Sequence, residues 1–176
     1  MFTKCVNELL KVFLHHAEKS EDLGILQTAM FGLGCIAKRM DKASFAAIKE
    51  GVVQLCKGIL QHPKANSEER GHLTDNTIGA LGKIAMFQYQ IGDKLSADIL
   101  TTFLQLLPLK HDEEEGQAIH KLLMEQILGR NEFLCQKEFE GLLLTALKAI
   151  KAEDTEHPEN EILDDKGREL MKQILG

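Results

Sequence analysis

The stretch AMFGLGCIAKRM (residues 29–40) returns 48 residues later as TIGALGKIAMFQ (residues 77–88). Leu, Gly, Ile and Ala recur at equivalent positions of the two copies, as Leu33-Gly34-x-Ile36-Ala37 and Leu81-Gly82-x-Ile84-Ala85. Both copies have the apolar spacing of a helix, and each follows another helix-like segment. Self-similarity at 40–50 residues without strands predicts stacked helical hairpins.

This period is typical of HEAT-type repeats, so we expect an all-α fold. The architecture would be an α-solenoid, a right-handed superhelical stack of about four HEAT-type hairpins that holds partners rather than performing chemistry. A closed helical bundle is the alternative. The recurrence favours the solenoid, because a bundle has no reason to repeat its second helix in its fourth. Gly34 and Gly82 stand inside helices, which predicts that neighbouring helices approach closely there.

Eight helices are expected between the prolines and polar loops, over roughly 2–18, 20–39, 43–60, 73–91, 95–107, 112–128, 131–151 and 161–175. Ser20 is the expected N-cap of the second helix. Paired in order, the helices give a single domain of residues 1–176 with repeats at 1–40, 43–92, 94–129 and 131–175.

Composition excludes several classes of function. The 176 residues are 44% hydrophobic and 27% charged, which is typical of a globular domain, and no apolar run approaches the ~18 residues of a membrane span. A net charge of −6 disfavours nucleic acid and favours basic partners. The four cysteines show no C-x-x-C spacing, which indicates a reduced, intracellular compartment and no zinc site.

One stripe of the repeated helices, with Ile78, Leu81 and Ile84, is expected to face the core. The opposite stripe would then line the concave surface of the solenoid. The candidate partner-binding residues on that surface are Phe31, Arg39, Asn76, Lys83, Phe87, Gln117 and Lys121. Asn76 and Lys83 have two interpretations, a stabilising polar surface or a ladder of ligands for an extended peptide.

Two acidic runs, 113–115 and 153–161, also have two interpretations. They are either favourable charges at helix starts and in a solvated loop, or a negatively charged surface that binds a basic segment of a partner.

The stretch LTDNTIGALGKI (73–84), followed by LLPLKHDEEEGQAIHKLL (106–123), resembles the importin-beta (karyopherin-beta) nuclear transport receptors, closest to the beta-3 type. QTAMFGLGCIAKR (27–39) and GRELMKQI (167–174) fit the same region in the same order, whereas 131–147 departs from the pattern. The resemblance implies HEAT repeats near the C-terminal end of a much longer receptor. It also implies protein cargo, control by the Ran GTPase, contact with nucleoporins, and shuttling between cytoplasm and nucleus.

Two other functions stay open, a HEAT scaffold or regulatory subunit with no transport role and a metal-dependent HEAT enzyme. None of the seven histidines is followed by Glu, and Glu69-x-x-His72 lacks the second copy that a di-iron site needs. No phosphate-binding or nucleophile motif is present. We therefore expect no catalytic, metal or cofactor residues, with His120 at the surface or in the groove. Terminal hairpins of such a stack expose apolar flanks, which predicts self-association.

Overall fold

The structure is a computed structural model that describes the backbone of residues 2–176 and the side chains of Val6 and of residues 8–176. The chain is all-α, and residues 2–176 contain no strand. The described α-helices are α1 (Phe2–Lys19), α2 (Leu23–Arg39), α3 (Lys42–Leu60), α4 (Gly71–Phe87), α5 (Lys94–Gln105), α6 (Glu113–Leu128), α7 (Glu140–Glu156) and α8 (Asp165–Leu175). None of these helices is long and apolar enough to cross a membrane.

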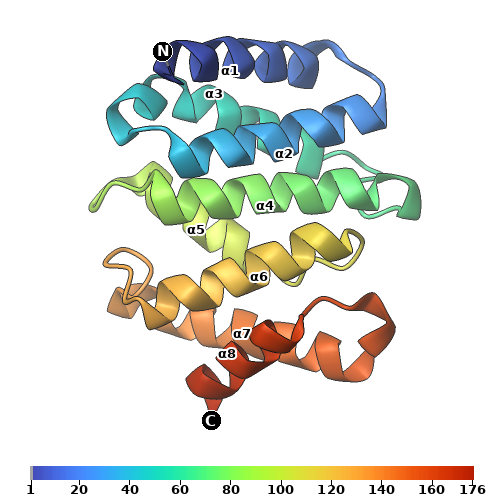
Figure 1. Cartoon of the computed structure of the whole chain (residues 1–176), viewed down its shortest axis with the longest axis vertical. Helices are drawn as coiled ribbons and strands as arrows, with labels where there is room; N and C mark the ends of the chain where they lie inside the picture. The colour runs from blue at the N-terminus through green and yellow to red at the C-terminus, as the bar shows by residue number, and fades with distance from the viewer. Residues whose placement is uncertain (1) are drawn as a thin grey trace.

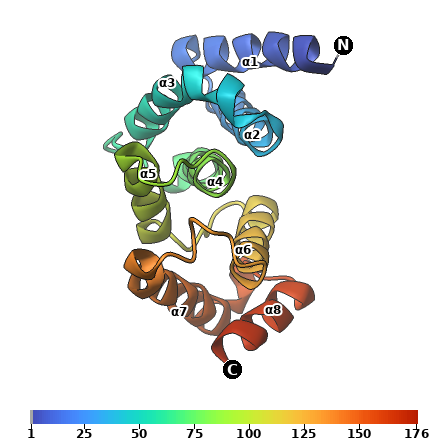
Figure 2. The ribbon, with the colours of Figure 1, turned by 90° about the vertical axis from the view of Figure 1, so that its left-hand side faces the viewer.

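The helices lie in two layers along the long axis of the molecule (Figure 1). Helices α2, α4, α6 and α8 follow one another in one layer, and α3, α5 and α7 form the other (Figure 2). Helix α1 lies across one end, packed mainly on α2, and the two termini lie at opposite ends. Helix α4 contacts α2, α3, α5 and α6 and is the centre of the fold.

Aspartate side chains start five of the helices, because a carboxylate accepts the unpaired N–H groups of the first turn. The N-cap residues are Asp22, Asp41, Asp93, Asp112 and Asp164. The prediction that Ser20 caps the second helix is wrong. Ser20 Oγ accepts the backbone N–H of Asp22, and Asp22 Oδ1 accepts that of Ile25.

The two copies of the repeated motif lie in α2 and α4, which pack against each other. A Cβ added at Gly34 would lie 3.1 Å from Ala80 Cα, so the α2 and α4 backbones are close at this point. A Cβ at Gly82 would lie 2.5 Å from Cε2 of Phe103 on α5. The predicted close approach is therefore confirmed at both glycines, although each faces a different neighbour.

Several predicted helix limits are wrong. The fourth helix ends at Phe87 rather than at residue 91, and the eighth begins at Asp165 rather than at 161. The largest error concerns residues 131–139, which form a loop and a 3-10 turn before α7. Asn131 Oδ1 accepts the N–H groups of Phe133 and Leu134, and these two apolar residues are buried without being helical.

Tyr89 joins this loop to the α3 side of the molecule. Its ring stacks on Phe133, with centroids 5.0 Å apart, and its hydroxyl donates to Glu132 Oε1 at 2.9 Å. The Lys42 ammonium lies 3.5 Å from the centroid of the Tyr89 ring, a cation–π contact.

Candidate partner-binding groove

Three successive helices of one layer enclose a hollow of ≈ 450 Å³. Its lining comes from α2, from Asn76 of α4 and from the start of α6, three helices that follow one another in one layer (Figures 1 and 2). We call this hollow the α2–α6 groove, and its lining residues are Gln27, Thr28, Phe31, Asn76, Asp112, Glu114, Glu115 and Ala118.

The α4 residue of the groove is Asn76, which is only 2% exposed. Its Nδ2 donates to the His72 carbonyl at 2.8 Å and to Asp112 Oδ2 at 2.6 Å. Gln27 Nε2 on α2 donates to the same Asp112 oxygen at 3.4 Å. Asp112 therefore links all three helices, while its other oxygen caps α6.

A buried ion pair joins α4 to α6 at the edge of the groove. Lys83 Nζ lies 2.5 Å from Glu115 Oε1, and the two side chains are 8% and 2% exposed. Burial raises the pKa of Glu115, against the opposing effect of the Lys83 ammonium. Gly79 leaves room for the carboxylate, because a Cβ there would collide with Glu115 Oε1.

Asp75 fixes the start of α6 against α4. Its Oδ2 accepts the backbone N–H groups of Lys110, His111 and Asp112 at 2.9, 2.6 and 2.9 Å. Burial raises the pKa of Asp75, and these three hydrogen bonds oppose that shift. The acidic first turn of α6 is held beside the groove as a result.

Phe31 is the aromatic residue of the groove and is 47% exposed. The Lys83 ammonium lies 5.1 Å from its ring centroid, but that ammonium is already paired with Glu115. Glu114 is exposed on α6. An aromatic face beside three carboxylates is an environment that attracts a cationic side chain.

The expectation that Asn76 and Lys83 lie on an open surface is wrong, because α6 packs over this face of α4 and both residues are buried. Phe87 is half-buried, with the Lys38 ammonium 5.8 Å from its ring centroid, and Arg39 is exposed at the end of α2.

Gln117 and Lys121 bind the segment that precedes α8. Gln117 Nε2 donates to the Glu161 carbonyl at 2.7 Å, and Lys121 Nζ donates to Asp164 Oδ2 at the same distance. Of the seven candidates, the structure thus brings Phe31 and Asn76 together in the groove, with Lys83 beside them. The roles of all seven in partner binding remain predictions.

Sequence reasoning missed Gln27 and Asp112 as groove residues. The acidic run 113–115 did point to this region, but nothing in the sequence showed which helix it would face. The prediction that His120 lies at the surface or in the groove is wrong, because its side chain is fully buried between the segment before α6 and the segment before α8.

No group of three or more potential metal ligands comes together among the described side chains. The chain matches no known family model, no curated protein and no solved structure.

Proposed function

We propose that the chain is a protein-binding α-solenoid segment of an importin-beta type nuclear import receptor, with HEAT-type hairpins at about 1–40, 43–92, 94–129 and 131–175. Two observations support the architecture. The second helices of the four proposed hairpins, α2, α4, α6 and α8, lie in one layer (Figure 2). The repeated motif falls on the neighbouring helices α2 and α4.

The observation that carries the proposed function is the α2–α6 groove itself. Phe31 presents an exposed ring beside Asp112, Glu114 and Glu115. A Lys or Arg side chain of an extended partner can place its cation over the ring and pair with a carboxylate. The proposed ligand is therefore a basic segment of a cargo protein.

The carboxylates of the groove also connect α4 to α6. Asp112 accepts from Asn76, and Glu115 pairs with Lys83. A basic ligand that binds either carboxylate competes with one of these internal contacts, so occupancy and the angle between the two helices become linked. In the full receptor, binding of Ran with GTP at other repeats would change the curvature of the stack and release the cargo.

Binding is tested with a short fluorescein-labelled peptide of Lys, Arg and Ser, followed by fluorescence anisotropy at low salt. We expect Phe31→Ala to weaken binding about tenfold, since a cation–π contact of this kind is worth about 1 kcal/mol or more. Glu114→Lys should weaken binding further and reduce its dependence on salt.

The matched control is Glu50→Lys, which makes the same charge change on exposed α3, outside the groove. It should leave binding close to that of the parent chain. Equal losses for Glu114→Lys and Glu50→Lys, or equal binding of a peptide with Glu in place of Lys and Arg, would refute the groove as the site.

The transport role is tested separately, with the longest natural form of the chain as bait in a cell extract. Release of captured proteins by Ran loaded with GTP supports transport. If Ran loaded with GTP releases none of the captured proteins, the result favours the scaffold or regulatory subunit instead.

A further inference from the structure

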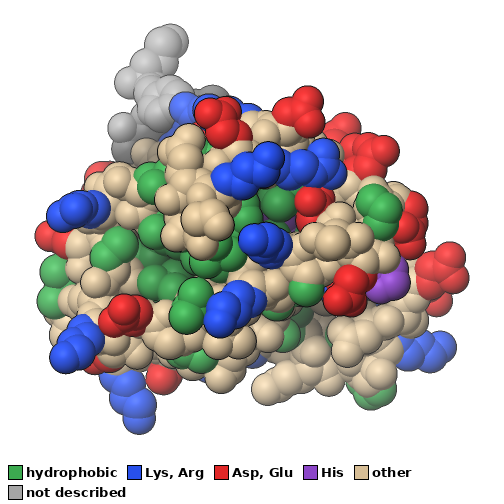
Figure 3. Space-filling view, turned by 90° about the horizontal axis from the view of Figure 1, so that it is seen from below, with side chains coloured by type: hydrophobic (Ala, Val, Ile, Leu, Met, Phe, Trp, Pro, Cys, Tyr) green, Lys and Arg blue, Asp and Glu red, His purple; other side chains and the backbone are tan. Residues whose placement is uncertain are grey.

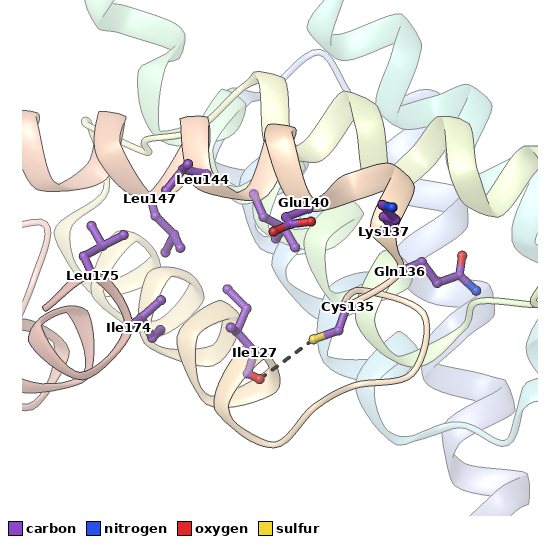
Figure 4. Close-up of a pocket in the computed structure, with 10 residues that line it drawn as sticks. Ile127, Cys135, Gln136, Lys137, Glu140, Leu144, Leu147, Ile174 and Leu175 are labelled. Atoms are coloured by element: carbon purple, nitrogen blue, oxygen red, sulfur yellow. Dashed lines mark hydrogen bonds between the residues drawn. The ribbon is translucent and has the colours of Figure 1, made fainter.

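A second hollow of ≈ 510 Å³ opens at the C-terminal end of the molecule (Figure 4). We call it the C-terminal hollow. Its apolar lining comes from the end of α6, from α7 and from the end of α8, and consists of Ile127, Leu143, Leu144, Leu147, Ile174 and Leu175. Leu144 is 43% exposed, so this apolar surface is open to solvent.

Basic residues flank this hollow. Lys137 lines it, Lys148 lies one turn beyond Leu144 on α7, and Lys172 precedes Ile174 on α8; all three lysines are exposed. In the space-filling view of this end, hydrophobic side chains gather in a depression with several Lys and Arg side chains around it (Figure 3). Glu140 lines the hollow as well and Glu138 is exposed next to Lys137, so three lysines stand against two glutamates.

The opposite end of the molecule carries exposed apolar side chains on α1, one of which, Val12, also borders a shallow hollow against α2. Leu9 and Val12 are 46% and 50% exposed, and their spacing of three places them on one face of the helix. We call this pair the α1 ridge. Acidic residues are exposed around it and on the following turn, namely Glu8, Glu18, Glu21 and Asp22, against Lys11 and Lys19.

The two ends are both apolar and exposed, and they differ in the sign of their surplus charge. One is an apolar helix ridge with a surplus of carboxylates, and the other is an apolar hollow with a surplus of ammonium groups. Because they lie at opposite ends of the long axis (Figure 1), a single molecule cannot bring them together. Only another molecule can fill the hollow with an α1 ridge.

We propose that the C-terminal hollow binds the α1 ridge of a second copy of this chain, in a head-to-tail contact. Such a contact pairs two different surfaces, so a dimer still has one free ridge and one free hollow. Further copies can therefore add at both ends, unless the rotation between neighbouring copies closes the assembly into a ring. This proposal does not depend on the α2–α6 groove or on its ligand.

The test uses Val12→Glu, which places a carboxylate on the ridge, and Leu144→Glu, which places one in the hollow. Sedimentation velocity over a range of concentrations should show the parent chain growing beyond two copies. Each variant alone should associate at least tenfold more weakly, because a carboxylate is costly to bury in an apolar contact.

The decisive sample is an equal mixture of the two variants. Val12→Glu keeps an intact hollow and Leu144→Glu keeps an intact ridge, so the mixture should form a complex of about twice 19.7 kDa that grows no further. Ile91→Glu, at an exposed apolar site in the α4–α5 loop, is the control and should associate as the parent does.

Three results would overturn the proposal. One is a parent chain that stays monomeric at every concentration. Another is association by Val12→Glu alone but not by Leu144→Glu, which indicates that two hollows pair with each other. The third is a mixture that behaves as the average of its two components. Circular dichroism spectra and melting curves verify that each variant is folded.

Discussion

Gly82 shows how much one missing methyl group matters at the centre of this fold. The Phe103 ring fills the space that a Cβ would need, and Phe103 is itself fully buried, so it has little freedom to move away. By contrast, Gly51 on α3 is exposed, and a Cβ there would meet nothing within 4 Å. The two positions therefore give a matched pair of helical glycines.

We expect Gly82→Ala to lower the free energy of unfolding by about 1–3 kcal/mol, through overpacking against Phe103. Gly51→Ala should raise it by about 0.5–1 kcal/mol, because alanine loses less backbone entropy in a helix. Urea unfolding followed by circular dichroism measures both. A stabilising Gly82→Ala would mean that the α4–α5 contact is looser than described.

His120 is a buried base whose protonation opposes folding. Nε2 accepts the backbone N–H of Leu109 at 3.2 Å, and Nδ1 lies 3.0 Å from the Ile162 carbonyl, so the proton is on Nδ1 and the ring is neutral. Burial lowers the pKa of His120 to about 4. In the unfolded chain the ordinary pKa of about 6.5 applies.

Between pH 6.5 and 4 the unfolded chain binds a proton that the folded chain does not. This contribution to stability is thus fully present above pH 6.5 and falls as the pH drops towards 4, by about 3 kcal/mol. Below the pKa of His120 in the folded chain, the contribution of His120 to stability falls no further. His120→Gln can keep both hydrogen bonds without titrating.

We expect the difference in unfolding free energy between the parent chain and His120→Gln to change by about 3 kcal/mol across this range. Urea titrations at several pH values measure it. Taking the difference removes the contributions of carboxyl groups such as Asp75 and Glu115. A difference that is the same at pH 7 and pH 4 would contradict a neutral, buried His120.

At the scale of elements, the contacts of α4 differ in kind on its two sides. Its contact with α2 includes the close approach of Gly34 to Ala80, whereas its contact with α6 includes the Lys83–Glu115 pair and the hydrogen bonds of Asp75 and Asn76. Removing one member of a buried ion pair leaves a charge without a partner, which is far more destabilising than removing both.

We expect Lys83→Met alone and Glu115→Leu alone each to cost about 3–5 kcal/mol, while the double variant unfolds close to the parent chain. Chemical denaturation of the four proteins gives the coupling energy. As a control, Lys11→Met and Glu8→Leu break an exposed pair on α1 and should have little effect. Additive losses at Lys83 and Glu115 would argue against the buried pair.

How far the elements could be predicted depended on their local signals. Helices α2, α3, α5 and α6 were placed to within a few residues, because their apolar periodicity is regular and an aspartate or a proline lies near an end. Residues 131–139 failed because buried Phe133 and Leu134 have the spacing of a helix although Asn131 holds them in a loop. Periodicity records burial, not backbone conformation.

The groove illustrates the same limit. Lys83 and Asn76 lie on the more polar face of α4, and a single amphipathic helix would turn that face to solvent. They are buried because α6 packs over them. This contact joins two segments that are distant in the sequence, so the pattern of α4 alone could not predict it. The acidic residues at the start of α6 indicated a binding region in the sequence, whereas nothing in the sequence pointed to Gln27 as a groove residue.

At the scale of the whole molecule, the two layers give an extended shape with the termini far apart (Figure 1). We expect small-angle scattering, extrapolated to zero concentration, to give a radius of gyration above the ~16 Å of a compact domain of this length. A value at or below ~16 Å would contradict the layered arrangement in solution. The Val12→Glu variant provides a control in which the proposed head-to-tail contact is weakened.

The all-helical class followed from the repeated motif, and the structure confirms it. The solenoid, the number of repeats and the transport role are still predictions, and they rest on the motif and the resemblance together. What the sequence lacked was the relative placement of the helices. That placement depends on contacts such as Asp75 with residues 110–112, which join segments 35 or more residues apart.

The sandwich of Lys42, Tyr89 and Phe133 has a practical consequence. The chain contains one tyrosine and no tryptophan, so its near-ultraviolet emission comes almost entirely from this single ring. That ring lies where α3, the α4–α5 loop and the α6–α7 loop meet, and it lines neither the α2–α6 groove nor the C-terminal hollow. A change in its emission lifetime on ligand addition would therefore mark movement of α3 relative to these two loops, with no need for an attached dye.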